Sequence, residues 1–164
     1  MKKTIALIAA VLVAGCAAYD GRGLVPGQSS AKDVEALMGR PAETIAVAGG
    51  DSVWYYPRGP YGKETYAVRI SPQGTMVSIE QRLTVENVRK LVRGVSTVKD
   101  VRELFGPPSR VYNMRLQQAQ SWEWLIDNGY LIDHFLVVQF SADGIVREVM
   151  MIRHPKYDIG DGRP

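Results

Sequence analysis

The chain has 164 residues, with 20 Lys and Arg against 17 Asp and Glu, and a formal net charge of +3. Two of those lysines, Lys2 and Lys3, lie in an N-terminal segment that we expect to be removed, which leaves a near-neutral balance of 18 to 17. Nucleic-acid binding needs a concentrated basic patch, so this balance argues against it. The only cysteine, Cys16, excludes an internal disulfide.

The first sixteen residues have the pattern of an export signal. Lys2 and Lys3 precede an apolar or small stretch at 4–15. That length matches the apolar core of a secretory signal peptide, and it falls short of the roughly 20 residues that a membrane-spanning helix needs. The sequence that ends the stretch, Leu12-Val13-Ala14-Gly15-Cys16, resembles the lipobox of bacterial lipoproteins.

The lipobox resemblance implies cleavage before Cys16, diacylglycerol on its thiol and an acyl chain on its new amine. Each buried CH₂ contributes about 0.8 kcal/mol, so several chains on one residue hold a protein firmly at a membrane. Ala17 and Ala18 follow in place of an aspartate, which by analogy with enterobacterial sorting implies the outer membrane. We expect a signal peptide at 1–15 and a lipidated tether at 16–23. An ordinary signal peptide with Cys16 there by chance is the alternative.

An internal repeat organises the rest of the chain. Residues 24–41 align without gaps with 91–108, and ten of the eighteen positions are identical. Further matches follow, between Trp54 and Trp122 and between 66–74 and 136–144. The sequence therefore predicts two copies of one module of about seventy residues, at 24–82 and 83–153. Two copies are too few for a solenoid, so we expect a two-lobed body.

Both copies show the same order of predicted elements. Serines at 29 and 96 are the expected helix N-caps, and Gly39 and Gly106 end the two helices. Four strands follow each helix, and the glycines of Gln73-Gly74 and Asp143-Gly144 suit hairpin turns. A short additional helix is predicted at 84–91. The expected strands are 44–47, 52–56, 64–70 and 75–80 in the first copy, and 110–115, 121–126, 135–140 and 145–151 in the second.

These patterns predict an α+β fold of two tandem modules, each a helix or helix pair packed on an antiparallel sheet of about four strands. The order 83–88, Gly94-Val95-Ser96, Asp100-Val101, Leu104-Phe105-Gly106-Pro107-Pro108 and Trp122 resembles the SmpA/OmlA (BamE-like) lipoprotein family. The tandem form is similar to the β-lactamase-inhibitor-protein architecture. The resemblance implies non-catalytic work, and the β-barrel assembly machinery of the outer membrane is the partner of the family's best-known member.

Residue types that carry out catalysis do not form a recognisable site. His134 and His154 are the only histidines, and the neighbours Asp133 and His134 would point to opposite faces of a strand. Neither a nucleophile elbow nor a phosphate-binding glycine loop is present. We therefore expect no enzyme activity, no bound metal or other cofactor beyond the lipid on Cys16, and no small-molecule substrate.

Two loops are the best candidates for contact with a partner. The first, at 57–63, carries Arg58 and Tyr61, and the second, at 127–133, carries Tyr130, Leu131 and Ile132. Aromatic and apolar residues at loop tips favour protein contact, although the tyrosines could instead fold back onto the sheet. The polar tail at 154–164 is expected to be flexible.

The predicted sheets also differ between the copies. Tyr66, Val68 and Ile70 alternate toward the expected helix side, as do Leu136, Val138 and Phe140. On the opposite face the second copy has Phe135, Val137 and Gln139, and this apolar face would invite a partner or the other lobe. We expect Trp54, Tyr56, Trp122 and Trp124 to pack in cores, with an aromatic binding surface as the alternative.

Taken together, the sequence predicts a lipid-anchored outer-membrane lipoprotein that faces the periplasm and binds an envelope protein. Assembly or maintenance of the envelope is the expected role. An inhibitor of a periplasmic or extracellular enzyme is the alternative, because paired loops on a tandem body also suit that function.

Overall fold

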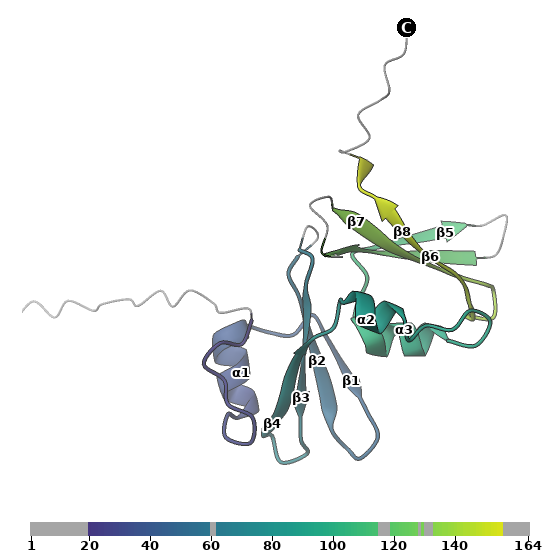
Figure 1. Ribbon diagram of the computed structural model, residues 1–164. Helices are drawn as coiled ribbons and strands as arrows, with labels where there is room; N and C mark the ends of the chain where they lie inside the picture. Colours follow the sequence, from purple (N-terminus) through teal and green to yellow (C-terminus); the bar gives the residue numbers. More distant parts are fainter. Residues whose placement is uncertain (1–19, 60–61, 115–118, 128, 130–132, 156–164) are drawn as a thin grey trace, which may run out of the picture.

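The computed structural model describes residues 20–59, 62–114, 119–127, 129 and 133–155 (Figure 1). Within these residues the chain forms two four-stranded antiparallel sheets and three short helices. No helix among them is long and apolar enough to cross a membrane. The elements in chain order are α1 (Ala31–Met38), β1 (Glu43–Ala46), β2 (Ser52–Pro57), β3 (Thr65–Ile70), β4 (Met76–Gln81), α2 (Val85–Val88), α3 (Val98–Phe105), β5 (Arg110–Met114), β6 (Ala119–Ile126), β7 (His134–Phe140) and β8 (Val146–Arg153).

Each sheet is a simple meander. The first sheet has the order β1-β2-β3-β4 and the second β5-β6-β7-β8, with every neighbouring pair antiparallel. A bulge interrupts the last pairing at the same place in both, after Arg69 and after Gln139. The predicted strands are confirmed to within a few residues. The helices are short, eight residues for α1 and α3 and four for α2.

The hairpin turns before β4 and β8 have the predicted glycines. Gly74 has φ of 80° and Gly144 has φ of 78°, in the left-handed region that glycine occupies without steric cost. Each donates its N–H to the carbonyl of a serine three residues earlier, Ser71 or Ser141, at 2.9 Å.

The predicted N-caps at Ser29 and Ser96 are wrong by one residue. The caps are Ser30 and Thr97, and each forms a reciprocal capping box with an aspartate three residues later. The earlier serines instead close the preceding turns, because Ser29 Oγ accepts from the Val25 N–H and Ser96 Oγ from the Val92 N–H, both at 2.9 Å.

Two hydrophobic cores correspond to the two sheets. Val34 and Met38 of α1 belong to one buried cluster with Val68 and Ile70 of β3. The second cluster joins residues of α3 to strand residues, including Trp122, Trp124, Leu136, Val138 and Phe140. Trp122 and Trp124 lie edge to face, with ring centroids 6.1 Å apart. The prediction that these tryptophans pack in a core is therefore confirmed.

The capping boxes give the fold a pH dependence. The carboxylates of Asp33 and Asp100 accept from the backbone N–H and the hydroxyl of their cap residues. These hydrogen bonds, the backbone ones first, hold the pKa of both carboxyls below the usual 3.8. Because the folded pKa is depressed, the stabilisation is complete above the usual value and is lost as the pH falls through the folded value.

We therefore expect Asp100→Asn to lower the free energy of unfolding at pH 7, because a neutral amide accepts these hydrogen bonds less strongly. The difference from the parent chain should disappear near pH 2. Urea unfolding across this pH range measures it, with Glu86→Gln in the first turn of α2 as the matched loss of one charge. A difference that persisted at pH 2 would show that the charge of Asp100 is not the cause.

Candidate functional site

The loop candidates fall only partly within the described residues. Cys16, Tyr61, Tyr130, Leu131 and Ile132 lie outside them.

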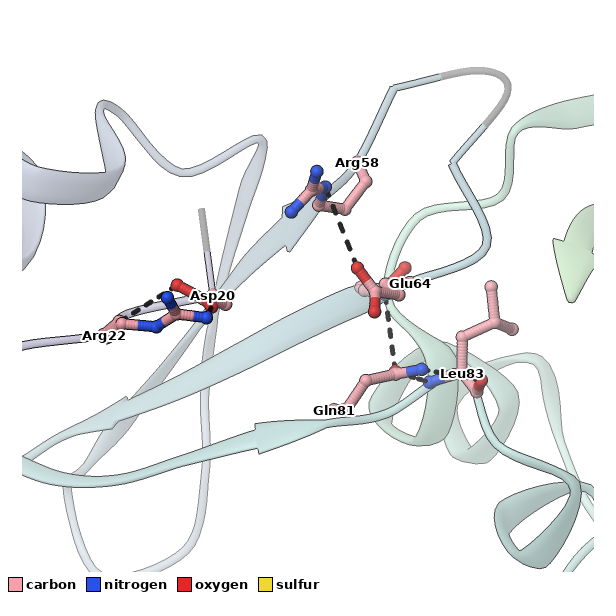
Figure 2. A network of polar contacts seen from close by, with 7 residues as sticks. Asp20, Arg22, Arg58, Glu64, Gln81 and Leu83 are labelled. Atoms are coloured by element: carbon pink, nitrogen blue, oxygen red, sulfur yellow. Dashed lines mark hydrogen bonds and ion pairs between the residues drawn. The ribbon is translucent and has the colours of Figure 1, made fainter. Parts of the chain in front are cut away.

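Arg58 is the one loop candidate that the structure describes, and it is exposed just beyond the end of β2. Its N–H donates to the carbonyl of Glu64 at 3.0 Å, and its Nε lies 3.8 Å from Glu64 Oε2 (Figure 2). These contacts close the base of the first loop.

Gln81 connects the base of the first loop to the segment before α2. Its Oε1 accepts from the N–H of Thr65 at 3.4 Å and from that of Leu83 at 2.6 Å (Figure 2). Its Nε2 donates to the Leu83 carbonyl at 3.0 Å. Leu83 is 2% exposed and belongs to the core of the second sheet, so this one side chain couples the first sheet to the second core.

The bases of the two loops meet through an ion pair between Lys63 and Asp133. Lys63 lies just before β3 and Asp133 just before β7, at matching positions of the repeat. Asp133 is 8% exposed, and its carbonyl accepts from the His154 N–H at 2.8 Å. A carboxylate this buried needs a charged partner, which Lys63 supplies. The ion pair therefore brings the two candidate loops to the same end of the molecule.

A second set of contacts joins α3 to the face of the first sheet that points away from α1. Here Val53, Tyr55 and Ala67 form a separate buried cluster. The Tyr55 hydroxyl donates to the carbonyl of Glu103 at 2.8 Å, and Arg102 Nε donates to Glu43 Oε1 at 2.6 Å. Burial raises the pKa of Tyr55 to about 12. We call this set of contacts the α3 junction.

Gly106, at the end of α3, makes the close approach possible. A Cβ at this position would lie 2.6 Å from the Tyr55 ring, much closer than a Cβ contact allows. Its counterpart Gly39, at the end of α1, would meet nothing within 4 Å. Both glycines have a positive φ, so the conformation is shared and only Gly106 is crowded by a neighbouring sheet.

A cleft of about 670 Å³ lies beside the α3 junction. Val53 and Tyr55 line it from the first sheet, together with charged side chains from both halves, including Arg69, Arg82 and Lys99. Each of these cations has a carboxylate partner: Asp51 at 2.5 Å, Glu80 at 3.3 Å and Glu103, respectively. The cleft thus runs along the seam between the two halves, with its charges largely compensated.

The two histidines lie at the same end of the second sheet, because His134 pairs with Arg153, the residue before His154. His134 is the first residue of β7, and His154 follows β8 and stacks on Phe135 with ring centroids 4.8 Å apart. Among the described residues, no three side chains of His, Cys, Asp or Glu are grouped so that they could hold a metal ion.

The α3 junction corrects the expectation about which sheet face meets the other lobe. The sequence predicts the Phe135, Val137 and Gln139 face of the second sheet as one possible site of that contact. The contacts described above lie instead on the Tyr55 and Ala67 face of the first sheet. A signal for this contact is present in the sequence, because Val53, Tyr55 and Ala67 make this face of the first sheet apolar as well.

Comparison with known proteins adds little to this picture. No protein-family model and no curated protein sequence matches the chain. Among solved structures it is similar to a DUF4309 family protein, YjgB, from Bacillus subtilis, with 20% identity and a TM-score of 0.32. The match covers 81% of this chain and 84% of that one. So low a TM-score says nothing about what either half binds.

The α3 junction can be tested with two neighbouring tyrosines. Tyr55→Phe removes the hydrogen bond to Glu103, and we expect it to lower the free energy of unfolding by about 1 kcal/mol. Tyr56 is the matched control, because its buried hydroxyl has no hydrogen-bond partner among the described residues. Tyr56→Phe should be neutral or stabilising. Equal losses in urea unfolding of both variants would argue against the junction as described.

Proposed function

We propose that this chain is a lipid-anchored lipoprotein of the outer membrane, facing the periplasm, that binds an envelope protein without catalysing a reaction. The lipobox ending at Cys16 supports the anchor. We further propose that each half is one α+β module of the SmpA/OmlA (BamE-like) type, with its helix covering one face of its sheet. Envelope assembly or maintenance is the role, and the β-barrel assembly machinery is the first partner to examine.

The ion pair between Lys63 and Asp133 is the observation that best supports protein binding. It holds the bases of two loops together, and those loops carry the tyrosines at 61 and 130. Two loops of one rigid platform can contact one partner at little additional cost in conformational entropy, because the platform is already ordered. Arg58, on the first loop, adds a residue type that is frequent at interface hot spots.

The same two loops also suit the alternative function, an inhibitor of a periplasmic or extracellular enzyme. An inhibitor and an assembly factor differ in what the bound partner does afterwards. Identification of the partner, followed by an assay of its activity with and without this chain, therefore separates them.

The anchor is tested by Cys16→Ser. We expect the parent chain to fractionate with the outer membrane and the variant to appear in the soluble periplasmic fraction, because a serine cannot form the thioether to diacylglycerol. Metabolic labelling with a palmitate analogue should mark the parent only. An unlabelled parent, or a variant that stayed in the outer membrane, would contradict lipid anchoring.

The loops are tested by a photo-crosslinking amino acid placed in intact cells at Arg58, Tyr61 or Tyr130. We expect the three positions to capture the same envelope protein. Glu86, exposed on α2, is the control position and should not capture it. Identical products from all four positions, or no envelope protein from the loop positions, would reject the loops as the binding site. If the captured protein is an enzyme that the purified chain inhibits, the inhibitor function replaces the assembly role.

A further inference from the structure

The second sheet has an open face that matches the face covered by α3 on the first sheet. Figure 1 shows α2 and α3 on one side of β5–β8 and no described helix on the other side. We call this other side the open face. Tyr112 and Ile152 on it are each 47% exposed, while Val137 near its centre is 8% exposed. The side chains that form it include Arg110, Tyr112, Leu125, Phe135, Val137 and Ile152, of which Leu125 is 5% exposed and Phe135 has His154 stacked on it.

The strand register gives the correspondence between the two faces. Glu43 pairs with Tyr55, which pairs with Ala67 on the next strand. In the second sheet Arg110 pairs with Glu123, which pairs with Val137. The open face is therefore the repeat-related copy of the surface on which α3 docks, with Arg110 in the place of Glu43.

The helices α1 and α3 correspond in the same way, but the positive and the negative charge change places between helix and sheet. At the α3 junction, Arg102 of the helix contacts Glu43 of the sheet. The repeat places Glu35 of α1 at the position of Arg102. A helix like α1 on the open face would thus set Glu35 against Arg110, the same ion pair with its two partners reversed.

The ion pair between the bases of the two loops also joins positions that correspond in the repeat. In the ion pair of Lys63 with Asp133, each residue occupies the position of the other in the repeat. Because Lys63 and Asp133 already pair within each molecule, the charge complementarity that a second copy adds comes from Glu35 and Arg110.

We propose that a second copy of this chain docks its α1 on the open face, in a head-to-tail repetition of the α3 junction. The contact joins two different surfaces, so one molecule can engage a neighbour at each end, and the product is an open chain of molecules unless the rotation closes a ring. This self-association goes beyond the proposed loop function and does not depend on it.

The exposed side of α1 is compatible with this contact. Glu35 and Ala36 are exposed, whereas their counterparts Arg102 and Glu103 are partly buried by the first sheet. Gly39 is in open space, whereas Gly106 lies against Tyr55. The α1 helix of the second molecule would therefore carry a glycine, Gly39, at the point where the docked helix comes closest to the sheet.

One difference makes the intermolecular contact weaker than the internal one. Glu123 stands in the place of Tyr55, so the donor that reaches the helix carbonyl is missing. The contact also lacks the covalent link that holds α3 at high effective concentration. We therefore expect reversible association that increases with protein concentration.

Charge reversal tests the pairing. The protein is the secreted form of the full chain carrying Cys16→Ser, so that no lipid interferes, and sedimentation velocity measures its association over a range of concentrations. We expect Glu35→Arg or Arg110→Glu to raise the dissociation constant at least about tenfold, because attraction becomes repulsion. The double variant should restore association to within about threefold of the parent, because the pair is complementary again.

Matched controls are Glu86→Arg on α2 and Arg89→Glu at its C-cap, because α2 has no counterpart among the described residues of the first half. They change the net charge by the same amounts and should leave association unchanged. A parent chain that stayed monomeric would overturn the proposal. That result is expected if the chain's own residues after 155 occupy the open face. Single reversals without effect, or a double variant without rescue, would overturn it as well.

Arg110→Glu also places a carboxylate beside Glu123, so a second measurement avoids that change. In the same Cys16→Ser chain, Glu35→Cys and Arg110→Cys together should give a ladder of multiples with a short bifunctional maleimide. Either cysteine alone should give dimers at most, and Glu86→Cys with Arg110→Cys should give no ladder. A ladder from the control pair, or none from the test pair, would reject the head-to-tail contact.

Discussion

The position of α3 between two sheets determines how the two halves are joined. Its apolar residues Val101 and Phe105 are fully buried in the core of the second sheet. The side that remains for the first sheet is therefore polar, and the contacts there are an ion pair and a hydrogen bond rather than a second apolar stripe. A helix of eight residues can serve both sheets only if its two sides use different chemistry.

The Arg102–Glu43 ion pair is the most constrained of these contacts. The side chains of Arg102 and Glu43 are 39% and 19% exposed, so Glu43 has lost more of its hydration, and its Oε2 has no hydrogen-bond partner within the described part of the chain. Such a pair contributes little net stability on average. Removing one partner is costly, however, because the other charge is left poorly solvated. The pair therefore fixes which surfaces meet more than it strengthens their contact.

Most of the secondary structure could be predicted from the sequence, because the repeat presents each pattern twice. The turns at Gly74 and Gly144 and the strands around them follow from local rules that each copy satisfies separately. The N-caps were missed because two adjacent hydroxyl residues compete in each copy. The spacing to the aspartate decides between them, since a capping box needs its acidic residue at the third helical position.

The junction between the halves could not be predicted in the same way. It joins residues nearly fifty positions apart, Tyr55 and Glu103, and no local pattern relates them. The apolar side chains of β2 were compatible with a core on either face. Only the partner helix shows that Tyr55 faces α3, while its neighbour Tyr56 belongs to the cluster beneath α1. The loop residues at 61 and 130–132, outside the described part, remain predictions.

The N-terminal end of the described chain sharpens what the proposed anchor would impose. Gly21 is buried, and a Cβ there would lie 2.3 Å from the Ile79 side chain, so the chain is already packed against the first sheet at this point. Leu24 also packs against the first core. A lipid on Cys16 would then lie five residues before the first packed position, Gly21, rather than eight residues before the first module at Leu24. Five extended residues span about 17 Å, so α1 and the first sheet would lie close to the membrane surface.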